Sequence, residues 1–242
     1  MTDADLSKLT DLHFRSGAVA TMGLTEVERP EQFGIVGMDQ AGRIERFKEK
    51  PRTEEVFSNV INAGTYVLQK EALSHIPAGT KYDFSKNLFP DLLSKGRPLF
   101  AGRLDGYWKD IGNPTDLFQA NLAMAERHGE PTFLPGMTTE GQIVATEVLG
   151  EGADIIGPTY LGENVTLERG SVVRASALGK GSRIGKGASI ENSLLLDGCL
   201  VHASARVVNC VLGEGCVVGP GVSLEGSVLG DKAQVDGPES LR

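Results

Sequence analysis

Residues 171–201 read SVVRASALGKGSRIGKGASIENSLLLDGCLV, and this stretch decides the fold of the C-terminal half. Aliphatic residues return in it at steps of five or six, and the pattern repeats after 17 residues, as Leu178 and Leu195 illustrate. A fixed period is the signature of a repeat architecture, in which each unit packs on the next. The stretch therefore predicts a stack of similar structural units.

The same period extends on both sides of this stretch. One series of 16 positions holds only leucine, isoleucine or valine: Leu149, Ile155, Leu161, Leu167, Val173, Leu178, Ile184, Ile190, Leu195, Val201, Val207, Leu212, Val218, Leu224, Leu229 and Val235. Small residues stand two positions before most of these: Ala153, Thr159, Val165, Ser171, Ser176, Ser182, Ala188, Ser193, Cys199, Ala205, Cys210, Cys216, Val222, Ser227 and Ala233. Inward positions two residues apart match the period of a β-strand, not of a helix.

Each step therefore predicts a short strand with one small and one aliphatic side chain facing inward, followed by a turn. The glycines after the aliphatic residues, such as Gly179 and Gly213, suit such turns. Three strands in 17 residues form one triangular coil, and the series from Leu149 to Val235 predicts five stacked coils. All three cysteines belong to the small series, so we expect them to be buried free thiols.

The composition of the chain changes along its length. Of the 14 aromatic residues, 13 lie before residue 137, whereas the narrow interior of the predicted coils has no room for aromatic rings. We therefore place one domain at residues 1–130, a linker at 131–140 and the repeat domain at 141–242. The first domain has to carry the chemistry that the regular repeat does not offer.

The overall composition excludes several classes of protein. The chain has 242 residues, with 24 basic and 32 acidic side chains and a net charge of −8, which argues against a nucleic-acid partner. It contains no apolar run long enough to span a membrane and begins with no signal-peptide pattern, so we expect no membrane partner. Three cysteines without such a signal favour the reducing cytoplasm.

The first domain alternates between two kinds of pattern. We expect strands over residues 17–24, 34–38, 43–47, 62–68, 98–104 and 107–109, and helices over 5–14, 83–94 and 114–128. In the last helix, Asn113 is the expected N-cap and Pro114 the first helical residue. Strands that alternate with helices predict an α/β layer, for which we expect a parallel sheet.

Five short strings in this domain occur in a characteristic order. They are Phe33-Gly-Ile-Val36, Glu49-Lys-Pro51, Ile61-Asn-Ala-Gly-Thr-Tyr66, Asp83-Phe-Ser85 with Leu88-Phe-Pro90, and Gly106-Tyr-Trp-Lys-Asp-Ile-Gly112. Followed by the repeats, they resemble the sugar-1-phosphate nucleotidyltransferases, most closely those similar to mannose-1-phosphate guanylyltransferase. The repeats resemble the hexapeptide-repeat proteins, and this resemblance implies a left-handed parallel β-helix after a partial Rossmann-like nucleotidyltransferase domain.

The resemblance implies a reaction and a set of residues. A sugar 1-phosphate attacks the α-phosphate of a nucleoside triphosphate (NTP) and gives a nucleotide sugar and pyrophosphate, with GDP-mannose as the expected product here. Lys50 would act in catalysis by neutralising the sugar phosphate, and Glu49 and Asn62 would bind sugar hydroxyls. Gly34 would let the backbone approach the sugar. Asp110 would bind the cofactor Mg²⁺ through oxygen.

The sequence also departs from the family. No string of the type G-G-x-G-T-R-L, which wraps the nucleotide phosphates, occurs in the chain, and the second metal carboxylate of the family is expected upstream of Met1. We therefore expect a fragment that lacks its nucleotide-binding front and has little turnover alone. The last coil shows no cap, so we also expect an incomplete far end.

Two other functions remain open at this point. The chain fits a non-catalytic regulatory or assembly subunit that binds a nucleotide sugar. For the nucleotidyltransferase, we expect the β-helix to serve the assembly of a homo-oligomer. Some hexapeptide-repeat proteins are acyltransferases with a histidine base, and His202 is the candidate for that role. We expect His202 to be a solvated turn residue instead, because no inserted loop builds a pocket around it.

Overall fold

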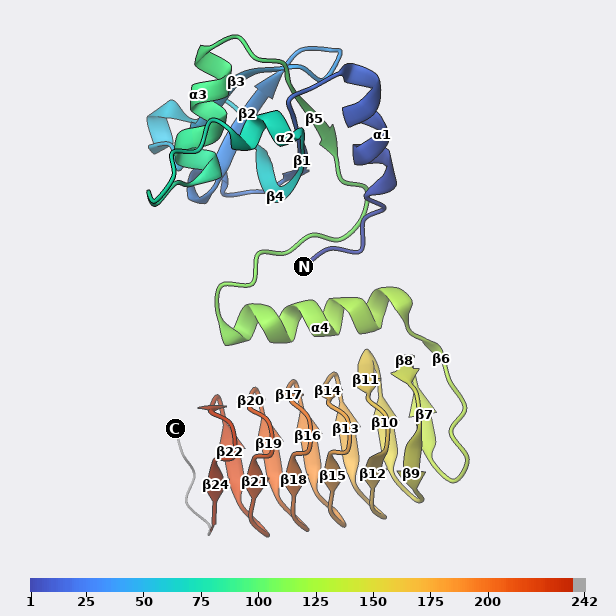
Figure 1. Ribbon diagram of the computed structural model, residues 1–242. Coiled ribbons are helices and arrows are strands. Elements are labelled where there is room, and N and C mark those ends of the chain that lie inside the picture. Colours follow the sequence, from blue (N-terminus) through green and yellow to red (C-terminus); the bar gives the residue numbers. More distant parts are fainter. Residues whose placement is uncertain (237–242) are drawn as a thin grey trace. The chain divides into compact units, whose positions relative to one another are not determined.

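The computed structural model describes residues 1–236, which fold as two compact units that divide between Trp108 and Lys109 (Figure 1). Within the described residues, no helix has the length and apolarity that crossing a membrane requires. The elements of the first unit are α1 (Ser7–Ser16), β1 (Ala20–Glu26), η1 (Pro30–Gln32), β2 (Gly34–Met38), β3 (Ile44–Glu49), η2 (Thr53–Glu55), β4 (Val60–Leu68), α2 (Lys70–Leu73), η3 (Phe84–Leu88), α3 (Phe89–Ser94) and β5 (Leu99–Arg103).

The five strands of the first unit form one mixed sheet in the order β3-β2-β4-β1-β5. Only β1 and β5 run parallel, so the expectation of a parallel sheet is wrong. The reason is a tight turn after β2, where Oδ1 of Asp39 accepts the N–H groups of Ala41 at 2.8 Å and Arg43 at 2.9 Å. A turn this short returns the chain as an antiparallel neighbour.

Helical segments lie on both sides of this sheet (Figure 1). The helix α1 packs on β1 and β5 through Leu9 and His13, which are buried, whereas Leu6 is exposed and Leu12 only half-buried. The segments α2, η3 and α3 cover the other face, where Phe89 belongs to the core. The predicted helix over 83–94 is a π-helical turn, η3, followed by α3.

The expected strand over 107–109 is absent from the described structure. Trp108 forms only an isolated bridge with Thr2, and Tyr107 is held by Thr2 and Asp3 through the Thr2 hydroxyl and the Asp3 carboxylate. The strand 34–38 lies where the sequence predicts it, and the others shift by a few residues.

The second unit consists of one helix and a stack of short strands. Its elements are α4 (Pro114–His128), β6 (Glu130–Pro131), β7 (Thr138–Glu140), β8 (Gln142–Ala145), β9 (Val148–Gly150), β10 (Asp154–Ile156), β11 (Thr159–Leu161), β12 (Val165–Leu167), β13 (Val172–Arg174), β14 (Ala177–Leu178), β15 (Arg183–Ile184), β16 (Ser189–Glu191), β17 (Leu194–Leu195), β18 (Leu200–Val201), β19 (Arg206–Val208), β20 (Val211–Leu212), β21 (Val217–Val218), β22 (Ser223–Glu225), β23 (Val228–Leu229) and β24 (Gln234–Val235).

These strands confirm the predicted parallel β-helix. Each strand pairs in parallel with the strand three places later in the chain, and this pairing gives three sheets (Figure 1). One sheet runs from β7 to β22, the second from β8 to β23 and the third from β9 to β24. The stack contains six coils rather than the expected five, because the first coil begins at Thr138. The segment 131–140, expected to be a linker, thus contains β7, and the two units divide earlier, after Trp108.

The helix α4 belongs to the second unit and runs lengthwise along one sheet of the stack (Figure 1). It begins as predicted, with the Asn113 side chain accepting the N–H of Asp116 at 2.9 Å and Pro114 in the first turn. It contacts β8, β11, β14 and β20. Ala177 on β14 points outward yet is buried, which is consistent with α4 covering this face.

The interior of the coils follows the two predicted series. Ile155 to Leu224 of the aliphatic series are buried together with Val235, and Leu229 is half-buried. Leu149 is the exception, with 47% of its surface exposed. It pairs with the outward residue Thr166, whereas Val148 pairs with the inward Val165, so the series is out of register by one residue in the first coil.

The glycines of the repeat serve two purposes. Most corners contain a residue with positive φ, for example Gly181 at 69° and Gly198 at 70°. Glycines that directly follow an aliphatic residue, such as Gly213, allow neighbouring coils to stack closely. A Cβ on Gly213 would lie 2.5 Å from Oδ1 and 2.6 Å from N of Asp231 in the next coil. The predicted turn function of Gly213 is therefore wrong, since what it provides is room between coils.

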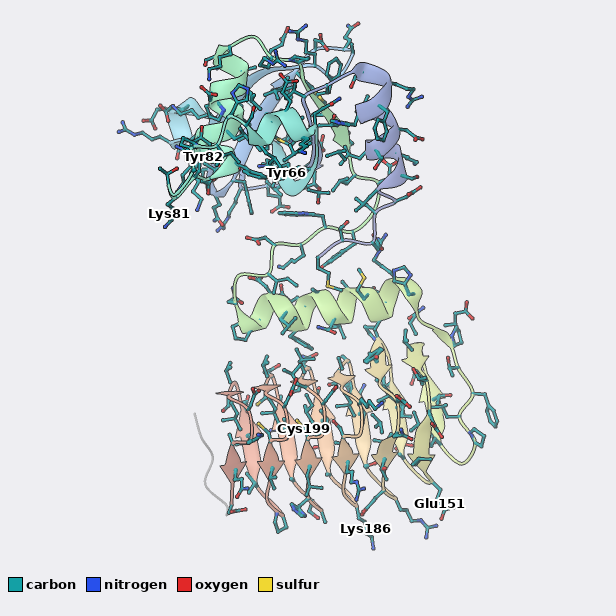
Figure 2. The ribbon with its side chains drawn as sticks, in the orientation of Figure 1. Tyr66, Lys81, Tyr82, Glu151, Lys186 and Cys199 are labelled. Atoms are coloured by element: carbon teal, nitrogen blue, oxygen red, sulfur yellow. The ribbon has the colours of Figure 1, made fainter. Side chains whose placement is uncertain are left out.

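The three cysteines are free and buried, as predicted. Cys199 lies inside the stack (Figure 2), where burial raises the pKa of its thiol to about 11. Burial also raises the pKa of the Cys210 thiol. Thiolates are the reactive form, so these side chains act as small core residues.

Candidate functional site

Three of the predicted site residues form a row across the sheet of the first unit. Gly34 pairs with Glu49 on β3, and the pairing of Ile35 with Ile61 puts Gly34 opposite Asn62 on β4. Residues directly opposite each other in a sheet point to the same face. Glu49 and Asn62 therefore flank a position that carries no side chain.

Gly34 is buried and makes room for its neighbours. A Cβ atom on this residue would lie 2.6 Å from Oε2 of Glu49 and 2.8 Å from Cζ of Phe47. No side chain fits there unless these groups move. The family resemblance implies that Gly34 lets the backbone approach the sugar. In the structure, the missing side chain of Gly34 leaves room for the Glu49 carboxylate, which points toward the centre of the row.

The carboxylate of Glu49 sits in a mixed electrostatic environment. Burial, and next the negative charge of Asp83, raise the pKa of this half-buried side chain. The positive charges of Lys50 and Lys86 act in the opposite direction. Both lysines are exposed and their side chains make no hydrogen bond or ion pair with another described residue, so they are available to an anion.

Lys50 has an unusual backbone conformation. Its φ is 44°, which costs energy for a residue other than glycine, and its N–H donates to the carbonyl of Phe33 at 2.9 Å. Pro51 follows and is buried, which fixes the chain on the other side. Strained backbone of this kind concentrates at functional sites, where the surrounding structure holds it.

Asn62 is only 9% exposed and its amide is held from three sides. Its Nδ2 donates to the Tyr66 hydroxyl at 2.8 Å and to Oγ of Ser85 at 3.0 Å, and its Oδ1 accepts the N–H of Gly64 at 2.9 Å. The register with β1 shifts at this point, so Asn62 fixes an irregularity in β4. Only the second lone pair of Oδ1 is left to accept a hydrogen bond.

Sequence reasoning missed two residues of this site, Tyr66 and Ser85. Tyr66 lies on β4 and packs its ring against Phe84 and Phe89, with centroids 5.9 and 4.9 Å away (Figure 2). Ser85 comes from η3, whose start is fixed by the Asp83 carboxylate accepting the N–H of Lys86. Both residues lie in the sequence strings that carry the family resemblance. Their spacing alone does not predict that the Asn62 amide donates a hydrogen bond to each of them.

Trp108 ends the first unit and is anchored near this row. Its Nε1 donates to the carbonyl of Ala63 at 2.9 Å, and its ring meets that of Phe33 edge to face at 5.7 Å. Phe33 in turn holds the backbone of Lys50. The indole thus packs between the strand that carries Asn62 and the segment before Gly34.

Asp110 belongs to the second unit, so its approach to Lys50 and Asn62 stays a prediction. It is exposed in the segment before α4. Among residues 1–236 no group of three or more histidine, cysteine, aspartate or glutamate side chains could hold a metal ion. Mg²⁺ often takes only one or two protein carboxylates and completes its shell with water and substrate phosphates, and its binding by Asp110 stays a prediction.

His202 lies exposed at a turn after β18. Its backbone N–H takes part in the regular stacking by donating to the Val218 carbonyl of the next coil. The surroundings of His202 are those of a solvated turn residue, as expected from the sequence.

Comparison with known proteins decides the family. The model of the family described as "Nucleotidyl transferase" matches residues 1–127, more than half of the chain. The chain belongs to the sugar-1-phosphate nucleotidyltransferases. The family model described as "GMPPB C-terminal domain" matches residues 155–239 of this nucleotidyltransferase chain.

Several curated relatives match the chain at moderate identity. The chain is 34% identical to a UTP–glucose-1-phosphate uridylyltransferase of Synechocystis sp., over 70% of this chain and 45% of that protein. It is 31% identical to a mannose-1-phosphate guanylyltransferase of Mycobacterium tuberculosis, over 71% and 47%. The nucleotidyltransferase chain thus spans about half the length of the curated relatives it matches.

Proposed function

We propose that this chain provides the sugar 1-phosphate side of an enzyme that makes GDP-mannose from mannose 1-phosphate and GTP. Membership of the nucleotidyltransferase family supports the class of reaction. The choice of mannose and guanosine rests on the C-terminal family model and on guanylyltransferase relatives, such as the catalytic subunit beta of Drosophila melanogaster, 32% identical over 62% of this chain and 41% of that protein.

The observation that carries this proposal is the strained backbone of Lys50 beside the row of Glu49, Gly34 and Asn62. Lys50 has a φ of 44°, its N–H donates to the carbonyl of Phe33, and its side chain is exposed. Its positive charge acts on the neighbouring Glu49 carboxylate, which lies in one row with Asn62. A phosphorylated sugar needs this combination, because its phosphate requires a cation and its hydroxyls require acceptors. Positive φ alone does not distinguish Lys50, because Ala175 and Lys232 adopt it in turns of the repeat. What distinguishes Lys50 is its position directly after Glu49, at the end of the row.

The reaction would proceed as an in-line displacement. A phosphate oxygen of the sugar 1-phosphate forms a bond to the α-phosphorus of the NTP, and the bond between that phosphorus and the bridging oxygen to the β-phosphate breaks. Lys50 would hold the sugar phosphate and offset its negative charge as the two anions meet. Mg²⁺, bound by Asp110, would supply the remaining positive charge.

The proposal is tested by calorimetric titration of the 242-residue chain with mannose 1-phosphate in the presence of Mg²⁺. Replacing Lys50 by glutamine removes a charge-assisted bond, so we expect binding to weaken by about 10- to 100-fold. Lys48→Gln is the matched control, because Lys48 is an exposed lysine on β3, two residues before Lys50, and pairs with Glu55. The control should bind as the wild type does.

Two results would contradict the proposal. Equal affinities for Lys50→Gln and the wild type would remove the phosphate-binding function of Lys50. Tighter binding of glucose 1-phosphate than of mannose 1-phosphate would contradict the choice of sugar while leaving the class of reaction standing, since the Synechocystis relative is named for glucose 1-phosphate.

A further inference from the structure

The orientation of the Asn62 amide is determined by its backbone neighbour. The N–H of Gly64 can only donate a hydrogen bond, so the atom that it meets at 2.9 Å has to be Oδ1. The NH₂ group then faces the hydroxyls of Tyr66 and Ser85, at 2.8 and 3.0 Å. Both amide hydrogens are used within the protein.

This orientation dictates what the Ser85 hydroxyl does. Its oxygen accepts from Nδ2 of Asn62, so its own hydrogen points elsewhere. No described residue accepts that hydrogen, although Ser85 is half-buried. A half-buried donor with no protein acceptor beside a substrate-binding row is a donor for the substrate or for water.

The backbone of Ser85 is held in place rather than loose. It lies in η3, whose first turn is closed by the Asp83 carboxylate accepting the N–H of Lys86 at 2.9 Å and by Oδ1 of Asn87 accepting the N–H of Asp83 at 3.0 Å. A π-helical turn is rare in proteins and is found often at functional sites. The hydroxyl is therefore presented at a fixed position relative to Asn62.

We propose that Ser85 determines sugar specificity by donating its O–H to one hydroxyl of the bound hexose. The proposal rests on the proposed function. A sugar hydroxyl both donates and accepts, and the row already contains acceptors in the Glu49 carboxylate and the free lone pair of Asn62 Oδ1. Ser85 supplies the complementary donor.

The test compares Ser85→Ala with Ser85→Thr and a control in the full chain by calorimetric titration with mannose 1-phosphate and Mg²⁺. One lost hydrogen bond should weaken binding to Ser85→Ala by about 3- to 10-fold, and Ser85→Thr, which keeps the hydroxyl, should restore it. Ser94→Ala is the control, because the exposed Ser94 hydroxyl only donates to the carbonyl of Asp91. Thermal unfolding confirms that each variant is folded.

Ser85 could affect sugar binding by direct contact with the sugar or by positioning the Asn62 amide. A thermodynamic cycle separates these two effects. Wild type and Ser85→Ala are titrated with each monodeoxy analogue of mannose 1-phosphate, lacking the hydroxyl at C2, C3, C4 or C6. Direct contact predicts that, for one analogue, both proteins bind equally. The proposal is overturned if Ser85→Ala weakens mannose 1-phosphate and all analogues by the same factor, or weakens none of them.

These results are distinguishable from a failure of the proposed function. If wild type binds mannose 1-phosphate and depends on Lys50 but not on Ser85, only the specificity inference is wrong. If the wild type binds no sugar 1-phosphate at all, the proposed function is wrong, and the inference about Ser85, which rests on it, is wrong as well.

Discussion

At the scale of single residues, the site combines backbone strain with side chains held by the protein itself. Lys50 carries a positive φ, Gly34 yields its space to Glu49, and the amide of Asn62 is fixed by Gly64, Tyr66 and Ser85. Such a site is preorganised, because little side-chain freedom is lost when a ligand binds. The exposed lysine is the one flexible group in this set.

A buried histidine in α1 makes the stability of the chain depend on pH. His13 is 2% exposed, its Nδ1 lies 2.9 Å from the Thr21 hydroxyl, and burial lowers its pKa from the usual 6.5. The folded state thus favours the neutral ring, and the stability that this contributes is present above about pH 6.5 and is lost as the pH falls below it. We expect His13→Gln to flatten this part of the profile.

The measurement is the free energy of unfolding in urea between about pH 7.5 and pH 5. His202→Gln is the control, since His202 is exposed and should leave the wild-type slope unchanged. An equal slope for His13→Gln and wild type would show that the ring does not contribute.

The sequence indicated Gly34, Glu49 and Asn62 as candidate site residues but not how these residues are connected. Glu49 and Asn62 come from quoted strings, and the structure puts both on one face of neighbouring strands around Gly34. The bond from Asn62 to Ser85 joins residues 23 positions apart, and no periodicity encodes it. His13 was missed because the helical pattern was read from leucines, and the buried face is Leu9 with His13 instead.

At the scale of elements, the β-helix was predictable because one periodicity sets both its strands and its core. The error in the first coil has a physical origin: Leu149 continues the count of aliphatic residues, yet backbone pairing places Val148 inward. Side chains alternate along a strand, so a shift of one residue reverses every face. The mixed sheet of the first unit was not predictable from strand patterns alone, since strand direction depends on turns such as the one closed by Asp39.

Close stacking of coils gives a test at this scale. Gly213→Ala would place a methyl group against the backbone and carboxylate of Asp231, so we expect the free energy of unfolding to fall by roughly 1–3 kcal/mol. Gly230→Ala is the matched control, because no atom of residues 1–236 lies within 4 Å of a Cβ at this position. Urea unfolding measures both variants, and equal losses would contradict the stacking function that we assign to Gly213.

At the scale of the whole molecule, the sugar-side row lies in one compact unit and the helix α4 with its β-helix forms the other. Asp110 lies two residues beyond Trp108, the last residue of the first unit. That one sugar 1-phosphate with Mg²⁺ engages both Lys50 and Asp110, residues of different units, stays a proposal.

The most direct test of this claim is to follow the backbone amide NMR signals of the full chain while mannose 1-phosphate is added with Mg²⁺. We predict that the largest shifts fall on Glu49, Lys50 and Asn62, on Ser85 in η3, and on Asp110. Shifts confined to the β-helix, or shifts that leave Lys50 and Asn62 unchanged, would contradict the assignment of the sugar 1-phosphate site to this row.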